Sequence, residues 1–145
     1  IIKARAFNQG YATVEYLAAA LLDQAWHQLP ADAPLQDVDQ FEIDALNRFK
    51  INVAEVPPRY KTPYFAHIWG GGYSAGYYAY LWSEVLDHDA FEWFKENGGM
   101  TRENGQTFRD QVLSRGNSEE LAAMYKAFRG KDPSVEPLLE FRGLK

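Results

Sequence analysis

Residues 67–80 read HIWGGGYSAGYYAY, and this stretch decides how the middle of the chain folds. The triplet Gly70-Gly71-Gly72 predicts a loop, because glycine adopts backbone angles that other residues avoid and lets another backbone approach closely. From Tyr73 onward the sequence favours a helix that runs to about Leu86. A second short helix is expected over residues 90–96, where apolar residues return.

The predicted helix from Tyr73 carries two different faces. Residues at spacings of four, seven and eleven share one side of a helix, and that side carries Tyr73, Tyr77, Tyr80 and Glu84. We expect the other side to pack into a core through Tyr78, Leu81, Trp82 and Val85. A phenol is a neutral hydrogen-bond donor at pH 7, which suits an oxygen that gains negative charge in a reaction. The alternative is that these aromatic residues only pack.

The rest of the chain also indicates helix, so the sequence predicts an all-α fold with at most a short strand near residues 60–66. Pro57-Pro58 excludes a helix just before that segment. Elsewhere apolar residues recur with a helical period, and small polar residues precede these segments as candidate caps: Thr13, Asp37, Thr101, Asn117 and Ser134. The triplet Asp87-His88-Asp89 fits a solvated helix end better than a metal site.

Composition excludes several classes of function. The 145 residues include 15 Lys and Arg against 20 Asp and Glu, so the net charge is −5 and neither nucleic acid nor an anionic membrane is an expected partner. The absence of cysteine removes disulfides, thiolate nucleophiles and zinc–thiolate sites. Neither His-Glu-x-x-His nor a phosphate-binding Gly-Lys-Ser/Thr occurs. Three histidines leave little material for a metal site, and none is expected here.

The central stretch resembles the C-terminal part of bacterial peptidyl-dipeptidases, which belong to the thimet oligopeptidase family of zinc metallopeptidases. The similarity runs in order along nearly the whole chain. The blocks that carry it include Phe7–Tyr11, Tyr64–Ile68, Gly70–Tyr73, Ala75–Trp82, Thr101–Gly105 and Leu113–Glu119. The block between His67 and Tyr80 is the most specific of them.

This resemblance implies a longer, mostly helical enzyme that removes dipeptides from the C-termini of oligopeptides. Enzymes of the family bind one zinc ion through the two histidines of a His-Glu-x-x-His motif and a further glutamate. Because residues 1–145 lack that motif, the resemblance implies that they are a C-terminal fragment of the catalytic domain. We therefore expect zinc in the full-length parent, none in this fragment, and no activity from the fragment alone.

The resemblance also assigns roles to individual residues. Tyr80 matches the tyrosine whose hydroxyl stabilises the oxyanion of the tetrahedral intermediate. Tyr73 matches a substrate contact near the scissile bond, and His67 matches a histidine beside the bound peptide. Tyr77 is expected to touch substrate from the same face. Gly70, Gly71 and Gly72 match a mobile loop that closes over the peptide.

Two other classes of function remain open from the residues alone. A stand-alone helical module would bind peptides in an aromatic groove without cleaving them, and a helical scaffold would leave the glycine loop unexplained. The expected partners are an oligopeptide substrate, the remainder of the parent chain, and a second copy of the fragment through exposed apolar surface. A cytoplasmic location is expected, although a chain without cysteine also fits the periplasm.

Overall fold

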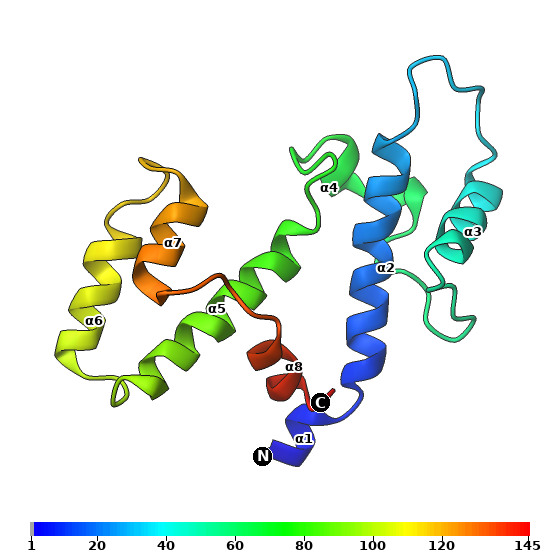
Figure 1. Cartoon of the computed structure of the whole chain (residues 1–145). Helices are drawn as coiled ribbons and strands as arrows, with labels where there is room; N and C mark the ends of the chain where they lie inside the picture. The colour runs from blue at the N-terminus through cyan, green and yellow to red at the C-terminus, as the bar shows by residue number, and fades with distance from the viewer. Residues whose placement is uncertain (1) are drawn as a thin grey trace. The chain divides into compact units, whose positions relative to one another are not determined.

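The computed structural model describes residues 2–145 and confirms the all-α prediction (Figure 1). Over those residues the chain forms eight α-helices, a 3-10 turn and a π-helical turn, and no strand. They are α1 (Ile2–Ala6), α2 (Gln9–His27), α3 (Val38–Arg48), η1 (Thr62–Tyr64), α4 (Ala66–Trp69), α5 (Ala79–Glu96), α6 (Arg102–Phe108), η2 (Arg109–Leu113), α7 (Leu121–Arg129) and α8 (Glu136–Arg142). No helix within residues 2–145 has the length and apolar character needed to cross a membrane.

The short strand expected near residues 60–66 is absent from the described structure. Those residues form η1 and the start of α4 instead. Pro63 lies in the first turn of η1, where its missing N–H leaves no bond unmade. The nearest β-like feature is one isolated bridge between Val53 and Val56.

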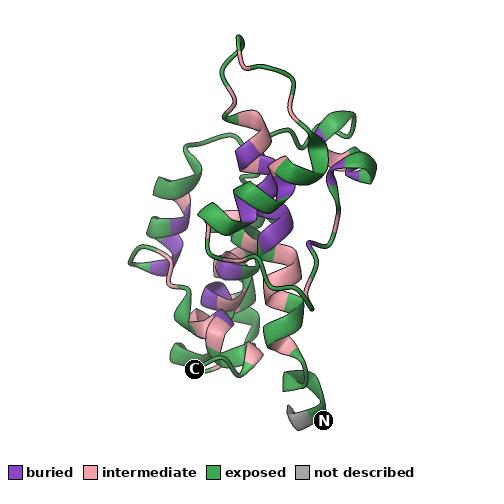
Figure 2. Ribbon diagram, turned by 90° about the vertical axis from the view of Figure 1, so that its right-hand side faces the viewer, coloured by how far each residue is buried: buried purple, intermediate pink, exposed green. Residues whose placement is uncertain are grey.

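The chain divides into two compact units, Ile1–Leu81 and Trp82–Lys145. In the first unit α3 packs against α2. Most of this unit's buried apolar residues fall into two clusters, and buried residues are coloured purple in Figure 2. One is built on Leu22, Ala25 and Ala45, with Trp26 and Phe41 packed against it. The other is made of Ala19, Ala20, Phe65, Ile68 and Tyr77, with Tyr16, Tyr60 and Leu81 around it.

A polar network fixes the segment that precedes α4. The buried Glu42 carboxylate of α3 accepts a hydrogen bond from the Thr62 backbone N–H at 2.8 Å. The Trp26 indole donates to the Thr62 hydroxyl and the Trp69 indole donates to the Thr62 carbonyl, each at 2.9 Å. Since buried polar groups must be paired, these bonds hold η1 and α4 against α2 and α3.

Some predicted helix starts are confirmed and others are wrong. The side chains of Asp37 and Thr101 accept hydrogen bonds from backbone N–H groups of α3 and α6, as N-caps do. Thr13 is not a cap, because α2 already begins at Gln9. Asn117 is not a cap either, since the Glu120 carboxylate accepts from the first N–H groups of α7.

The two helices expected after the glycines are in fact one helix that begins later. Tyr73 lies before α5, because Gly72 (φ 79°) and Ala75 (φ 55°) adopt left-handed angles that interrupt a right-handed helix. The triplet 87–89 does not end a helix in solvent. Asp89 is fully buried within α5, where the second unit supplies its partners.

The second unit has its own aromatic core and a buried ionic network. Ala90, Tyr125 and Phe128 form the core. The Asp89 carboxylate accepts from the Tyr125 hydroxyl at 2.8 Å and from Arg129 Nε at 3.2 Å. The remaining guanidinium nitrogens of Arg129 donate to both oxygens of Glu96 at 2.6 and 3.0 Å, and this bond lowers the pKa of Glu96.

Arg129→Ala is expected to destabilise the second unit strongly. The change leaves the buried Asp89 carboxylate without its cation, which typically costs about 3–5 kcal/mol of unfolding free energy. Lys126→Ala is the control, because Lys126 is more than half exposed and pairs with an exposed Asp132, so its loss is expected below about 1 kcal/mol. Chemical denaturation measures both, and equal small losses would contradict the role given to Arg129.

Candidate functional site

The glycine segment leaves α4 as a tight, hydrogen-bonded turn. The N–H groups of Gly70 and Gly71 both donate to the Ala66 carbonyl, at 3.0 and 2.9 Å. The Tyr73 N–H then donates to the His67 carbonyl at 3.0 Å. The Ser74 hydroxyl donates to the Ile68 carbonyl at 2.6 Å. These bonds fold residues 70–74 back over α4 and fix where Tyr73 leaves the backbone.

The three glycines differ in what they contribute. A Cβ at Gly71 would lie 2.9 Å from the His67 Cα, which no packed structure accepts without a shift. Gly72 has φ 79°, which disfavours any side chain there. Gly70 is under neither constraint, because a Cβ at this position would enter open space and its φ of −143° is accessible to other residues. The turn therefore requires glycine at positions 71 and 72.

A buried carboxylate on α2 holds the next part of the chain. Asp23 has no exposed surface. Its Oδ1 accepts from the Ala75 N–H and its Oδ2 accepts from the Tyr77 N–H, each at 2.9 Å. Gln24 donates to the Ala75 carbonyl at 2.7 Å. Ala75 is thus held by α2 at both its N–H and its carbonyl, in a left-handed conformation that costs a residue with a Cβ about 1–2 kcal/mol.

Tyr73 precedes the segment that Asp23 holds and Tyr80 follows it, and the two side chains lie against each other. Their rings stack with centroids 5.2 Å apart and planes 19° apart, and each side chain keeps about a third of its surface exposed. A hydrogen bond with the Tyr73 hydroxyl is the main reason that the pKa of Tyr80 is raised above its ordinary value. The Tyr80 phenol is therefore a neutral donor at neutral pH.

The expected row of three tyrosines on one helix face is not formed. Tyr77 is only 2% exposed and packs in the core against Phe65 and Tyr16, with burial as the main cause of its raised pKa. Tyr78 and Trp82, expected in the core, are about half exposed. The left-handed turn at Ala75 rotates the chain before α5 begins, so the helical spacing that starts at Tyr73 does not apply.

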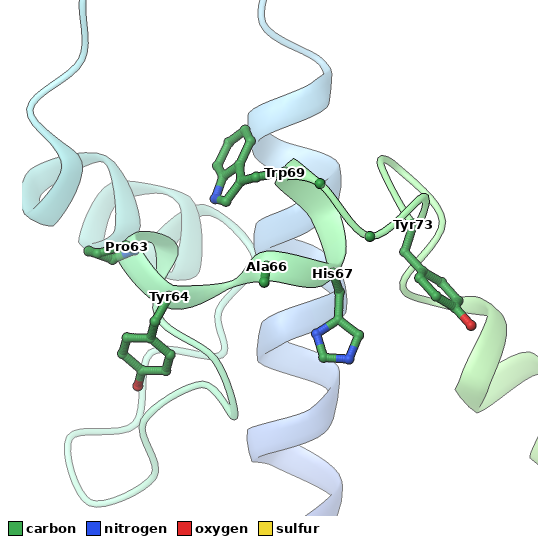
Figure 3. A pocket seen from close by; sticks show the side chains of 8 residues that line it. Pro63, Tyr64, Ala66, His67, Trp69 and Tyr73 are labelled. Carbon is green, nitrogen blue, oxygen red and sulfur yellow. The ribbon is translucent and has the colours of Figure 1, made fainter.

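An open groove of about 680 Å³ runs beside α4. It is lined by Pro63, Tyr64, Ala66, His67, Trp69, Gly70, Gly71 and Tyr73. Figure 3 shows His67 and Trp69 projecting in opposite directions from α4. His67 is partly exposed, and its ring lies 4.8 Å from that of Tyr60 and 6.0 Å from that of Tyr73. The groove is mostly aromatic and apolar, with a few polar tips, as peptide-binding surfaces are.

The described residues offer no place for a catalytic metal. Within residues 2–145 no three His, Asp or Glu side chains lie close enough together to hold an ion. The site in this chain consists of phenols, one imidazole and backbone groups. It can donate hydrogen bonds and position a peptide chain.

Comparison with known proteins gives the class of this chain. Residues 1–144 match Peptidase family M3, and the chain belongs to that family. It is 54% identical over 142 residues to the dipeptidyl carboxypeptidase of Salmonella typhimurium, which covers 98% of this chain and 21% of that protein. The dipeptidyl carboxypeptidase of Escherichia coli is 54% identical over 138 residues, covering 95% and 20%. Oligopeptidase A of Escherichia coli is 48% identical over 106 residues, covering 71% and 16%.

These matches confirm the resemblance to bacterial peptidyl-dipeptidases. The chain spans about a fifth of the length of the curated dipeptidyl carboxypeptidases that it matches. The structure brings His67, Tyr73, Tyr80, Gly70 and Gly71 to one side of the first unit. The sequence did not identify Asp23 as important. An acidic residue among apolar residues of a helix indicates a buried carboxylate only when its hydrogen-bond partners are known, and these lie more than 50 residues away.

Gly71→Ala and Gly70→Ala form a matched pair that tests the turn. At position 71 the new Cβ meets the His67 backbone, so a loss of about 1–3 kcal/mol in unfolding free energy is expected, as for other overpacked sites. At position 70 the same methyl group meets open space and little loss is expected. Thermal denaturation compares the two variants, and equal losses would rule out the proposed close approach.

Tyr73→Phe is expected to lower the pKa of Tyr80. The hydrogen bond that the change removes is the largest contribution to the raised pKa, so Tyr80 should ionise at a lower pH in the variant. An alkaline titration followed by the ¹³Cζ resonance of Tyr80 measures this, with Tyr80→Phe identifying the signal. An unchanged midpoint would mean that the two hydroxyls do not interact in solution.

Proposed function

We propose that this chain supplies the oxyanion-stabilising and substrate-binding side of the active site of a zinc peptidyl-dipeptidase. In this proposal residues 1–145 are the C-terminal part of the catalytic domain, and the zinc ligands belong to another part of the parent chain. The observation that carries the proposal is the partly exposed pair of Tyr73, which lines the groove, and Tyr80, which stacks on Tyr73. Membership of Peptidase family M3 and the 54% identity to dipeptidyl carboxypeptidases support it.

The chemistry assigned to Tyr80 follows from its protonation and exposure. When water attacks a peptide carbonyl, the carbonyl oxygen gains negative charge and needs a donor that is already in place. The Tyr80 hydroxyl is neutral, and its raised pKa keeps it protonated well into the alkaline range. Tyr73 stacks on it, so the orientation of one phenol depends on the other.

His67 and the glycine turn are assigned to peptide binding. The His67 ring lines the groove and is steadied by its contacts with Tyr60 and Tyr73, so its partly exposed edge can hydrogen-bond a bound peptide. Gly70 and Gly71 line the groove and leave the backbone bare there, where an extended peptide can approach it, and Gly72 continues the same turn. Tyr77 lies behind Tyr80 with centroids 5.3 Å apart, so its burial favours support of that ring over direct contact with substrate.

Tyr80→Phe in the full-length parent enzyme is expected to lower kcat about 10²- to 10³-fold with little change in KM. The reason is that loss of one oxyanion donor removes stabilisation present mainly in the transition state. Steady-state kinetics on a short unblocked peptide, with dipeptide release followed directly, measures it. Tyr78→Phe is the control, since Tyr78 is a tyrosine about half exposed and it is Tyr80, not Tyr78, that stacks on Tyr73. A Tyr80→Phe enzyme with near-normal kcat would remove Tyr80 from this role.

The same assay separates the peptidase from a binding module. The isolated 145-residue chain and the full-length parent are each supplied with zinc and the peptide. Cleavage by the parent alone is the expected result, because residues 2–145 hold no cluster of three His, Asp or Glu side chains that could bind the zinc ion. Peptide binding without cleavage by the full-length protein would favour the module instead.

A further inference from the structure

The phenol pair depends on a carboxylate that lies outside the groove. Asp23 of α2 is fully buried, and its two oxygens accept from the backbone N–H groups of Ala75 and Tyr77. These donors lie 52 and 54 residues further along the chain. Ala75 and Tyr77 themselves lie between Tyr73 and Tyr80, so the carboxylate binds the backbone segment that connects these two tyrosines.

A third donor completes the surroundings of the carboxylate. His27 Nδ1 lies 2.8 Å from Asp23 Oδ1 and 2.9 Å from the Asp23 carbonyl oxygen. Both neighbours are acceptors, so Nδ1 must carry the proton and donate. A buried carboxylate needs such donors, because burial without them strongly disfavours its charge. The carboxylate is therefore fixed from α2 on one side and by the loop amides on the other.

The path from this anchor to the two rings is short and hydrogen-bonded. The Gly76 N–H donates to the Tyr73 carbonyl at 2.8 Å, and the Ala79 N–H donates to the Gly76 carbonyl at 3.0 Å. Ala75, which lies between Tyr73 and Gly76 in the chain, has a left-handed conformation. A residue with a Cβ keeps such a conformation only where its surroundings impose it. Asp23 and Gln24 are the groups that impose it here.

We propose that Asp23 is a positioning residue for the peptidase reaction, which sets the distance and angle between the Tyr73 and Tyr80 hydroxyls. The inference rests on the proposed function of that pair. Asp23 has no exposed surface, so it acts through the two phenols and not on the substrate. A displacement of about 1 Å at a reacting group can lower the rate about 10²-fold. Loss of a hydrogen bond between Asp23 and the 75–77 backbone should therefore lower kcat more than it changes KM.

Asp89 provides a matched control. It is also a fully buried aspartate that accepts hydrogen bonds, but its partners are Tyr125 and Arg129 of the second unit. Asp89→Asn therefore perturbs a buried carboxylate without touching residues 73–80. Comparing it with Asp23→Asn separates a general loss of stability from a specific loss of positioning.

The test is a set of variants in the full-length parent enzyme, assayed for dipeptide release. Asp23→Asn removes one acceptor and should lower kcat about 10- to 100-fold, with KM changed less than about threefold. Asp89→Asn should leave kcat nearly unchanged in the folded enzyme. In a background with both Tyr73→Phe and Tyr80→Phe, Asp23→Asn should lower kcat no further, since it acts only through the phenols.

Two results would overturn the inference. One is an unchanged kcat for Asp23→Asn, and the other is a decrease that is equally large in the double-Phe background. If Asp23→Asn does not fold, Gln24→Ala takes its place, with an expected decrease in kcat of about fivefold for one lost hydrogen bond and the same absence of effect in that background. The proposed function fails separately, if the double-Phe enzyme itself keeps normal kcat.

Discussion

The two hydrogen bonds from the amides of Ala75 and Tyr77 to the buried Asp23 carboxylate join distant parts of the first unit. Without them the carboxylate would be buried with too few donors, and of the two α2 groups that hold Ala75 in its left-handed conformation only Gln24 would remain. The turn at Ala75 delays the start of α5 to Ala79 and lets Tyr73 fold back onto Tyr80. The arrangement of the candidate site thus follows from one charged group on α2.

The candidate site combines a tightly packed base with a partly exposed surface. Phe65, Ile68 and Tyr77 form a packed base that is nearly closed to solvent. Tyr73 and Tyr80 next to that base stay about a third exposed, and the groove beside α4 has apolar and aromatic walls. A peptide main chain needs such a surface, because its carbonyls require donors while its side chains favour apolar contact.

Sequence reasoning reached the fold class and missed what depends on distant contacts, and the roles of the site residues stay predictions. Helical periodicity and caps such as Asp37 and Thr101 are local, and the structure confirms them. The start of α5 could not be predicted this way, because residues 73–78 favour a helix locally and Asp23 overrides that preference from another helix. Asp89 was misjudged for the same reason, since its partners Tyr125 and Arg129 lie 36 and 40 residues away.

The most direct test of this account is a crystal structure of the full-length parent with a phosphinic peptide, which mimics the tetrahedral intermediate of peptide hydrolysis. The distance to measure joins the Tyr80 hydroxyl oxygen to the nearest phosphinate oxygen. The account predicts about 2.7–3.1 Å, the range of a donor to an oxyanion, with Tyr73 still stacked on Tyr80 and the Ala75 and Tyr77 amides still bonded to Asp23. A phosphinate bound beyond the reach of Tyr80, with both phenols turned away from it, would contradict the account.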